Sequence, residues 1–328
     1  MKIILAPMEG LTDVYMRDIL TAIAGCYGYD WCVTEFIRIT QHLLPAKIFY
    51  QYCPELLRNS QTAAGTPVHI QLLGSDPQLL AENAQFAVEL GAPAIDLNFG
   101  CPAKSVNNHR GGAVLLQEPE TLHQIVLAVR KAVPQNIPVS AKMRLGYNDR
   151  LLMLDNALAI ESAGANWLTV HARTKVDGYR PPAHWHELAN IRQSVSLPVI
   201  ANGDVDSLSS LAACLQQSQC QDVMIGRGAV SRPDLVSQIK TQQIELTWPM
   251  LVEWQLRFLA NMYQAVVHPN INEAYVKSTE KGALGRYKQW LAMLSQAWPQ
   301  AQLLFEKVKR ESSYANVVSL LRSSTLMI

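Results

Sequence analysis

The chain of 328 residues has few cysteines, no long apolar run and almost no net charge. Its six cysteines form no Cys-x-x-Cys pair and no clustered cysteine–histidine spacing, which argues against a zinc site. No apolar stretch approaches the roughly 20 residues of a membrane-spanning helix. The apolar run at the N-terminus is too short for a secretory signal, because Pro7 and Glu9 interrupt it. We therefore expect a cytoplasmic protein with reduced cysteines, no disulfides and no metal.

The charges are nearly balanced, with 28 basic and 27 acidic side chains. This balance neither favours nor excludes a polyanionic partner. The distribution is uneven, since the segment from Pro249 to the C-terminus has nine basic and five acidic side chains. A basic C-terminal segment indicates a nucleic-acid partner, although a difference of this size also arises by chance. The sequence does not identify a protein partner, and we expect a monomer.

Short apolar runs recur along residues 1–242, and most are continuous rather than alternating, as in strands buried on both faces. Helix-like segments separate them, for example residues 76–91, with Asp76 as N-cap and Gly91 at the end. Eight strand–helix alternations predict an α/β fold, a (β/α)8 TIM barrel, rather than the alternative of a doubly wound open sheet. The runs begin at Ile3, Trp31, Pro67, Ala94, Pro138, Trp167, Pro198 and Asp222.

The pattern changes after Ile244, where strand-like runs stop. Residues 250–267, 272–297 and 301–310 show the spacing of amphipathic helices with no strand between them. We therefore predict a small all-helical domain at 249–328, with a boundary near residues 242–248.

Polar residues stand at the ends of the predicted strands, where TIM barrels carry their chemistry. Taken singly, His171 is more simply read as a core histidine, and Lys142 as a lysine that extends out of the barrel rim. Together the set predicts a polar ligand at the rim, because barrel interiors favour Val, Ile and Leu. The set comprises Pro7, Met8, Glu9, Gly10, Gln71, Asn98, Lys142, Arg144, His171, Arg173, Asn202, Gly203, Asp204, Gly226, Arg227 and Gly228.

Two glycine-containing loops narrow the identity of this ligand. Residues 201–204 and 225–228 follow the seventh and eighth predicted strands, where many TIM barrels bind a phosphate. A cationic Lys142 balances the negative charge of a reduced flavin ring, and Gln71 and Asn98 offer hydrogen bonds to its edge. The sequence therefore predicts FMN, a flavin with one phosphate.

Several motifs, in this order along the barrel, resemble those of the tRNA-dihydrouridine synthases. They are APMEGLTD, IQLLG, DLNFGCPAKSV, SAKMRLG, VHARTK, VIANGDV and MIGRGA. The most specific is the Asn-x-Gly-Cys-Pro element that begins at Asn98. The later GRYKQWL resembles the bacterial C subfamily, which acts on uridine-16 of the tRNA D-loop.

This resemblance implies an FMN-binding barrel followed by a helical domain that grips tRNA. It implies reduction of the C5–C6 double bond of uracil, with NADPH first reducing the flavin. Cys101 would be the proton donor, and Asn98 would face the uracil. FMN would be bound by Pro7, Met8, Glu9, Gln71, Lys142, His171, Asn202, Gly203, Asp204, Gly226 and Arg227. The tRNA would be held by Arg38, Tyr179, Arg286, Lys288 and Lys309.

Cys101 lies between Gly100 and Pro102, on a corner directly after a predicted strand. A thiol with an ordinary pKa of about 8.5 is mostly protonated at neutral pH, so it can donate a proton. The simpler reading of a free cysteine is a buried structural thiol. One departure from the family pattern places His109 and Arg110 in the loop expected to cover Cys101, and the sequence assigns His109 no role.

Three other functions compete with this one. A flavin-dependent dehydrogenase of a free pyrimidine would need no basic helical domain. A Schiff-base aldolase would use Lys142 as its nucleophile. A tRNA-binding chaperone would carry an idle active site. A synthase would have to take its uridine out of the base stack, at a cost of a few kcal/mol that binding elsewhere must offset.

Overall fold

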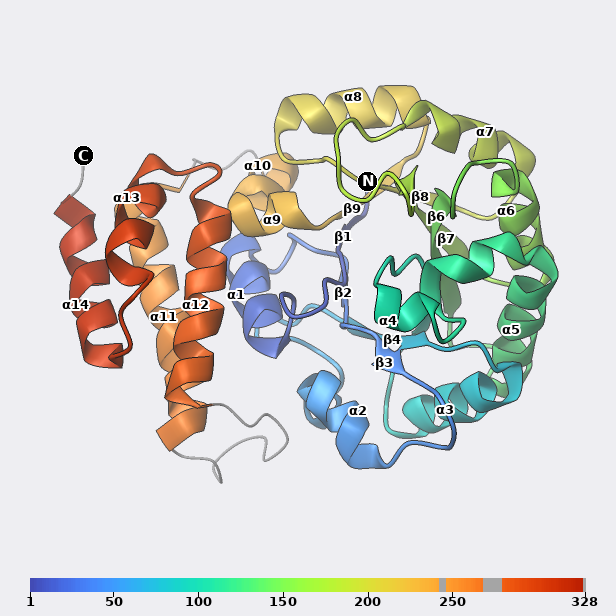
Figure 1. The fold of residues 1–328 in the computed structure, drawn as a ribbon, viewed down its shortest axis with the longest axis horizontal. Helices are drawn as coiled ribbons and strands as arrows, with labels where there is room; N and C mark the ends of the chain where they lie inside the picture. Colours follow the sequence, from blue (N-terminus) through green and yellow to red (C-terminus); the bar gives the residue numbers. More distant parts are fainter. Residues whose placement is uncertain (242–245, 268–278, 327–328) are drawn as a thin grey trace.

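The structure, a computed structural model, describes residues 1–241, 246–267 and 279–326. Its central element is a closed sheet of parallel strands (Figure 1). The strands are β1 (Ile3–Leu5), β2 (Trp31–Val33), β3 (Ile37–Arg38), β4 (Val68–Leu73), β5 (Ile95–Phe99), β6 (Val139–Gly146), β7 (Trp167–Thr174), β8 (Val199–Asn202) and β9 (Asp222–Ile225).

The pairing of the strands closes the sheet into a barrel. Strand β9 pairs with β1, β1 with β2, and β2 with β4, while β4 to β9 pair in sequence order. The short β3 follows β2 and pairs with the last residues of β4, so it extends the same position in the barrel. The eight-stranded TIM barrel predicted from the sequence is confirmed, and the open sheet was the wrong alternative.

Helices surround the strands and cover the outer face of the barrel (Figure 1). The predicted caps are present, since Asp76 accepts a hydrogen bond from the Leu79 amide at 2.9 Å at the start of α3. The helices of this part are α1 (Val14–Ala24), α2 (Ala46–Tyr52), η1 (Pro54–Arg58), α3 (Pro77–Glu89), α4 (Lys104–Asn107), η2 (Gly112–Gln117), α5 (Pro119–Ala132), α6 (Met153–Ser162), α7 (His186–Ser194), α8 (Leu208–Ser218), α9 (Arg227–Ser231) and α10 (Leu235–Thr241).

The strands are buried on both faces, but the two faces differ in chemistry. On β4, Val68, Ile70 and Leu72 belong to the large core between strands and helices. The residues between them, His69 and Gln71, are also buried and form contacts inside the barrel. Because successive side chains of a strand point to opposite faces, the same alternation places polar groups in the interior from β4 to β7. The apolar part of the interior is a small cluster of Ile4, Ala6, Val33, Ile200 and Met224.

Helices follow the barrel to the end of the chain, as predicted. They are α11 (Trp248–Val267), α12 (Glu280–Leu294), α13 (Pro299–Val308), α14 (Tyr314–Ser323) and η3 (Ser324–Leu326). In Figure 1 they lie beside α1 and α9, and α11 contacts α1 while α12 contacts α9. Part of the predicted boundary, residues 242–245, and the first residues of the predicted helix 272–297 lie outside the described residues.

Candidate active site

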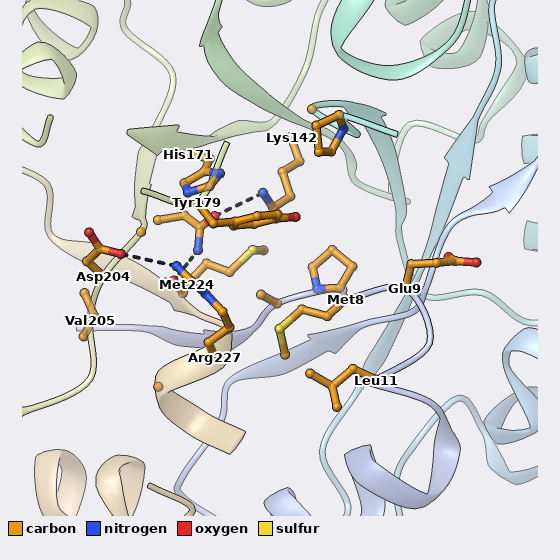
Figure 2. Close-up of a pocket in the computed structure, with 18 of the residues that line it drawn as sticks. Met8, Glu9, Leu11, Lys142, His171, Tyr179, Asp204, Val205, Met224 and Arg227 are labelled. Atoms are coloured by element: carbon orange, nitrogen blue, oxygen red, sulfur yellow. Dashed lines mark hydrogen bonds and ion pairs between the residues drawn. The ribbon is translucent and has the colours of Figure 1, made fainter. Parts of the chain in front are cut away.

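A cavity of about 670 Å³ opens at the carboxyl ends of the barrel strands (Figure 2). It gathers every residue that the sequence analysis proposed for cofactor binding, together with Cys101, Asn98 and Tyr179. The structure thus brings together side chains from seven strand ends and their loops. The predicted residues that line it are Pro7, Met8, Glu9, Gln71, Asn98, Cys101, Lys142, His171, Tyr179, Asn202, Gly203, Asp204, Gly226 and Arg227.

The side chain of Asn98 shapes the corner that carries Cys101. Its Oδ1 accepts hydrogen bonds from the amides of Gly100 and Cys101, both at 2.9 Å. Arg144 holds the same corner from β6, donating from Nε to the Gly100 carbonyl at 2.8 Å. Gly112 packs against the cysteine so closely that a Cβ there would lie 2.8 Å from the Cys101 carbonyl oxygen. These contacts fix the main chain of Cys101 at the rim of the cavity.

The thiol of Cys101 is suited to donating a proton. The residue is partly buried, and burial raises the pKa of its thiol above the ordinary value. The nearby Glu9 carboxylate acts in the same direction. The thiol therefore stays protonated throughout the neutral range, whereas a cysteine nucleophile would need a lowered pKa.

A chain of hydrogen bonds runs from this corner into the barrel. Asn98 Nδ2 donates to Gln71 Oε1 at 2.7 Å, and Gln71 Nε2 donates to Asp96 Oδ2 at 2.7 Å. Ser140 Oγ donates to the other oxygen of Asp96 at 2.6 Å. The side-chain amides of Asn98 and Gln71 thus have protein partners, and each NH2 group keeps a second hydrogen that can be donated to a ligand. The sequence analysis missed Asp96 and Ser140, although both stand two residues before a predicted site residue of the same strand.

Lys142 and His171 lie on neighbouring strands and face the cavity (Figure 2). Lys142 donates from Nζ to Asn202 Oδ1 at 3.1 Å. Burial, with a smaller contribution from the Arg144 guanidinium, lowers the pKa of Lys142 to about 8. Burial, followed by the charges of Arg144 and Lys142, also holds the pKa of His171 well below its usual range. His171 is therefore neutral at physiological pH, while Lys142 is mostly charged there.

Asp204 organises the loop after β8. Its Oδ2 pairs with Arg173 and accepts from the Ala183 amide at 2.9 Å, and its Oδ1 lies 3.4 Å from Arg227 Nη2. The preceding Gly203 has a φ of +122°, and a Cβ there would lie 3.1 Å from the His171 ring. Only glycine fits this position without strain.

Tyr179 stands between two guanidinium groups at the same side of the cavity. Its ring lies 5.2 Å from the Arg144 guanidinium and 5.0 Å from that of Arg227, within the range of cation–π interactions. The side chain is 55% exposed and lines the cavity, so a ligand can reach it.

Positive charge is in excess on this wall of the cavity. Four cationic side chains, Lys142, Arg144, Arg173 and Arg227, lie around His171, and the carboxylate of Asp204 pairs with two of them, Arg173 and Arg227. Such a wall favours an anionic ligand. The residues present therefore fit a cofactor with a phosphate group.

Carboxyl groups lie on the other side of the cavity. Glu35, after β2, accepts a hydrogen bond from the Gly10 amide and lines the cavity near Glu9. Burial, with a contribution from Asp13, raises the pKa of Glu35 to about 7. The sequence analysis missed Glu35, because it follows a short strand and belongs to none of the motifs.

The C-terminal helices supply a further wall that the sequence analysis also missed. Gln289 and Met293 of α12 line the cavity, as does Gln296 just after the end of this helix. The spacing of four residues between Gln289 and Met293 places both on one face of the helix. An amphipathic pattern predicts such a face but not what it covers.

The other predicted residues lie outside the cavity. Arg38 donates to the Ser105 carbonyl at 3.1 Å, next to the loop that follows Cys101. Lys288 donates to the Glu311 carbonyl, and Lys309 pairs with Glu306. Arg286 points to the loop between β1 and α1, where it pairs with Asp13 at 3.0 Å.

His109 and Arg110, the departure from the family pattern, lie on the surface of the loop after Cys101. His109 Nδ1 lies 2.7 Å from the Ser105 carbonyl oxygen. Arg110 has a φ of +57° and pairs with Glu118 at 2.8 Å. Neither side chain lines the cavity.

Within the described ranges, no group of three or more His, Cys, Asp or Glu side chains is arranged to hold a metal ion. None of the helices in the described parts of the chain combines the length and apolar character needed to cross a membrane.

Comparison with known proteins identifies close relatives. A family model described as "Dihydrouridine synthase (Dus)" matches residues 4–320. The chain is 50% identical over 330 residues to a "tRNA-dihydrouridine(16) synthase" of Pseudomonas syringae pv. tomato, covering 99% of each protein. It is 44% identical to the protein of the same name from Shewanella oneidensis, covering 99% of this chain and 98% of the relative.

Solved structures share the fold at much lower identity. An old yellow enzyme from Trypanosoma cruzi has a TM-score of 0.51 at 12% identity, covering 75% of this chain and 89% of its own. A 2-naphthoyl-CoA reductase complex has a TM-score of 0.55 at 12% identity, covering 73% of this chain and 49% of its own. At these identities the comparison supports the barrel fold alone.

Proposed function

The chain belongs to the dihydrouridine synthase family, and on that premise we propose that it reduces uridine-16 in the D-loop of tRNA to dihydrouridine. The relatives named tRNA-dihydrouridine(16) synthase support this substrate. The observation that carries the proposal is the position of Cys101. A thiol with a raised pKa stands at the rim of a cavity that has one cationic wall, on a corner anchored by Asn98 and Arg144.

We propose FMN as the cofactor, because the residues of the cavity fit it. Arg227, with the loop of Gly203 and Asp204, would hold the phosphate, as an anion site at the last two strands of a TIM barrel commonly does. Lys142 would face the flavin ring, where its charge offsets the negative charge of the reduced form. Bound FMN, reduced by NADPH, would supply the hydride that is added to C6 of uracil.

Cys101 completes the reaction by giving a proton to C5. One hydride and one proton convert the C5–C6 double bond to a single bond. Cys101 is then a thiolate, which water reprotonates. The raised pKa favours this direction, because the protonated thiol dominates at neutral pH. Because its pKa is lowered, His171 is neutral and does not donate a proton as an imidazolium; it would instead form a hydrogen bond with the ligand.

The tRNA would be held outside the cavity by basic groups. We propose residues 249–328 as the tRNA-binding domain, with Lys288 and Lys309 as phosphate contacts. Arg38 and Tyr179 would contribute from the barrel, and Asn98 would border the extruded uracil. Such contacts position the RNA rather than read its sequence. Arg286 belongs to the same predicted set, but its protein partners favour a different role, which is proposed below.

The experiment that tests the proposal is mass-spectrometric mapping of dihydrouridine. Unmodified tRNA is incubated with the purified protein, FMN and NADPH, and the D-loop fragment is examined for a mass increase of two hydrogens at position 16. A matched tRNA with cytidine at position 16 is the control. Product at another uridine would refute the site assignment, and no product with a flavin-loaded protein would refute the activity.

A further inference from the structure

The C-terminal helices dock on the barrel next to the cavity. The indole of Trp290, on α12, is fully buried and donates to the Val230 carbonyl at 3.1 Å. Trp298 donates to the Ser231 carbonyl at 3.1 Å. These bonds attach the helices to α9, which follows the β9 loop of the cavity. Since Gln289 and Met293 also line the cavity, the site is made by two parts of the chain that must stay in register.

Arg286 makes the second attachment, to the loop between β1 and α1. Its Nε donates to Asp13 Oδ2 at 3.0 Å, and its Nη2 donates to the Leu11 carbonyl at 2.7 Å. Its Nη1 donates to the Gly10 carbonyl and to Gln289 Oε1. All three nitrogens of the guanidinium therefore have protein acceptors, and the side chain is only 21% exposed.

The loop held by Arg286 is itself part of the cavity. Residues 8, 9 and 11 line it, and Leu11 is one of the residues whose carbonyl Arg286 binds. The loop is supported from the barrel side as well, because Glu35 accepts from the Gly10 amide and Arg17 donates to the Thr12 carbonyl at 2.7 Å. Arg286 provides the support from the C-terminal side.

We propose that Arg286 is a positioning residue, which keeps the loop of residues 8–13 and the α12 wall in register across the cavity. We name these groups the seam: Gly10, Leu11 and Asp13 on the barrel, and Arg286 and Gln289 on α12. The planar guanidinium suits this role, since it reaches several acceptors in fixed directions, which the single ammonium of lysine does not. A misplacement of about 1 Å in such a site can lower the rate about a hundredfold.

This proposal differs from the expectation that Arg286 holds a tRNA phosphate, and Arg286→Lys separates the two. A phosphate contact needs mainly the charge, so lysine would keep most of the tRNA affinity and its salt dependence. The seam needs the several directed N–H groups of the guanidinium, so lysine would support the loop hardly better than alanine does. We expect Arg286→Lys and Arg286→Ala each to lower kcat for dihydrouridine formation tenfold to a hundredfold, with little change in the affinity for tRNA.

Asp13→Asn provides the matched test from the other side of the seam. Asn caps a helix as well as Asp, so the hydrogen bond to the Met16 amide at the start of α1 is kept. The ion pair with Arg286 is lost, and we expect a smaller loss of kcat in the same direction, with no further loss when Arg286→Lys is added. Lys281→Ala, an exposed position on the same helix, is the control and should leave kcat unchanged.

Amide hydrogen exchange gives a readout that does not depend on activity. In Arg286→Lys, exchange of the peptide that covers residues 8–16 should accelerate, while peptides from β4 and β5 stay as in the wild type. Unchanged exchange and unchanged kcat in Arg286→Lys, together with weaker tRNA binding and a salt slope lowered by about one in Arg286→Ala, would overturn the seam in favour of a phosphate contact. The kcat measurements rest on the proposed function. If the wild-type protein forms no dihydrouridine, that function fails, and hydrogen exchange still decides the seam.

Discussion

Replacement of Cys101 by alanine tests the proton donor while leaving its surroundings in place. The contacts of this residue involve the main chain: its amide donates to Asn98 Oδ1 at 2.9 Å, and its carbonyl accepts from the Ala113 amide at 3.0 Å. Alanine keeps both main-chain bonds and loses the contact of the thiol with the Ala103 amide. Because the thiol is only partly buried, we expect the free energy of unfolding to change by less than about 1 kcal/mol.

The effect on the reaction should be much larger. A positioned general acid raises the rate of such a step roughly a hundredfold to ten-thousandfold, which corresponds to about 3 to 5 kcal/mol of activation free energy. Cys101→Ser is the matched variant, because the hydroxyl has nearly the same size but is a far weaker acid than the thiol. We expect serine to lose almost as much rate as alanine.

The assay separates the two halves of the reaction. Anaerobic stopped-flow absorbance follows reduction of the flavin by NADPH, and quenched samples analysed by mass spectrometry follow dihydrouridine formation in a single turnover. Only the second rate should fall in the Cys101 variants, and tRNA affinity should stay within about twofold. Wild-type rates of product formation in Cys101→Ala would refute the assignment of the proton donor.

The pH dependence of the wild-type protein supplies a further check. Burial raises the pKa of Cys101, so the protonated donor persists through neutral pH and is lost only at alkaline pH. The rate of the uracil step should therefore be flat up to about pH 8.5, near the ordinary thiol pKa, and fall above it. A fall that begins below pH 7 would show that another group supplies the proton.

Three further predictions concern groups around the cavity and beneath it. Lys142 is charged below its pKa of about 8 and neutral above it, so the rate of flavin reduction should fall as pH rises through 8. In Lys142→Met the rate should be low at all pH values and should show no inflection near pH 8. The same inflection in both proteins would contradict this role of Lys142. Asn98→Ala removes the acceptor of two amides and should lower the free energy of unfolding in urea by about 1–3 kcal/mol, whereas a loss of activity at unchanged stability would point to a role confined to the substrate. Arg17→Met leaves the buried Glu55 without its partner at 2.8 Å and should lower the free energy of unfolding by about 3–5 kcal/mol. Arg58→Met, which removes a more exposed ion pair with Asp18, should lower it by less than about 1 kcal/mol. Equal losses in the two variants would show that burial of the ion pair does not determine its contribution.

Much of the fold could be predicted because its signals are local. Apolar runs of strand length, the Asp76 cap and Gly91 at the end of α3 are features of neighbouring residues, and each appears in the structure where the sequence places it. The polar strand ends could also be predicted, because parallel strands bring their carboxyl ends to one rim. The family motifs then indicated that the ligand bound at this rim is a flavin.

Other features depend on pairings that no local pattern records. The continuous apolar appearance of the strands concealed the alternation that places Gln71, Asp96 and Ser140 in one hydrogen-bonded chain inside the barrel. The segment of α14 was not recognised as a helix, and β3 was not separated from β2. The helix α14 has local signals, since Ser313 caps it, whereas the hydrogen-bonded chain inside the barrel depends on pairing between distant segments.

The amino-acid sequence by itself determined the barrel, its polar rim and the cysteine on its corner, because periodicity, caps and motifs act over a few residues. Only the tertiary structure decided that α12 walls the cavity and that Arg286 meets Gly10, 276 positions earlier in the chain. A basic residue on an amphipathic helix has the same local signature whether it faces a phosphate or a carbonyl. Which of the two it meets depends on how the helix docks, and that is set by the packing of Trp290 and Trp298 on the barrel.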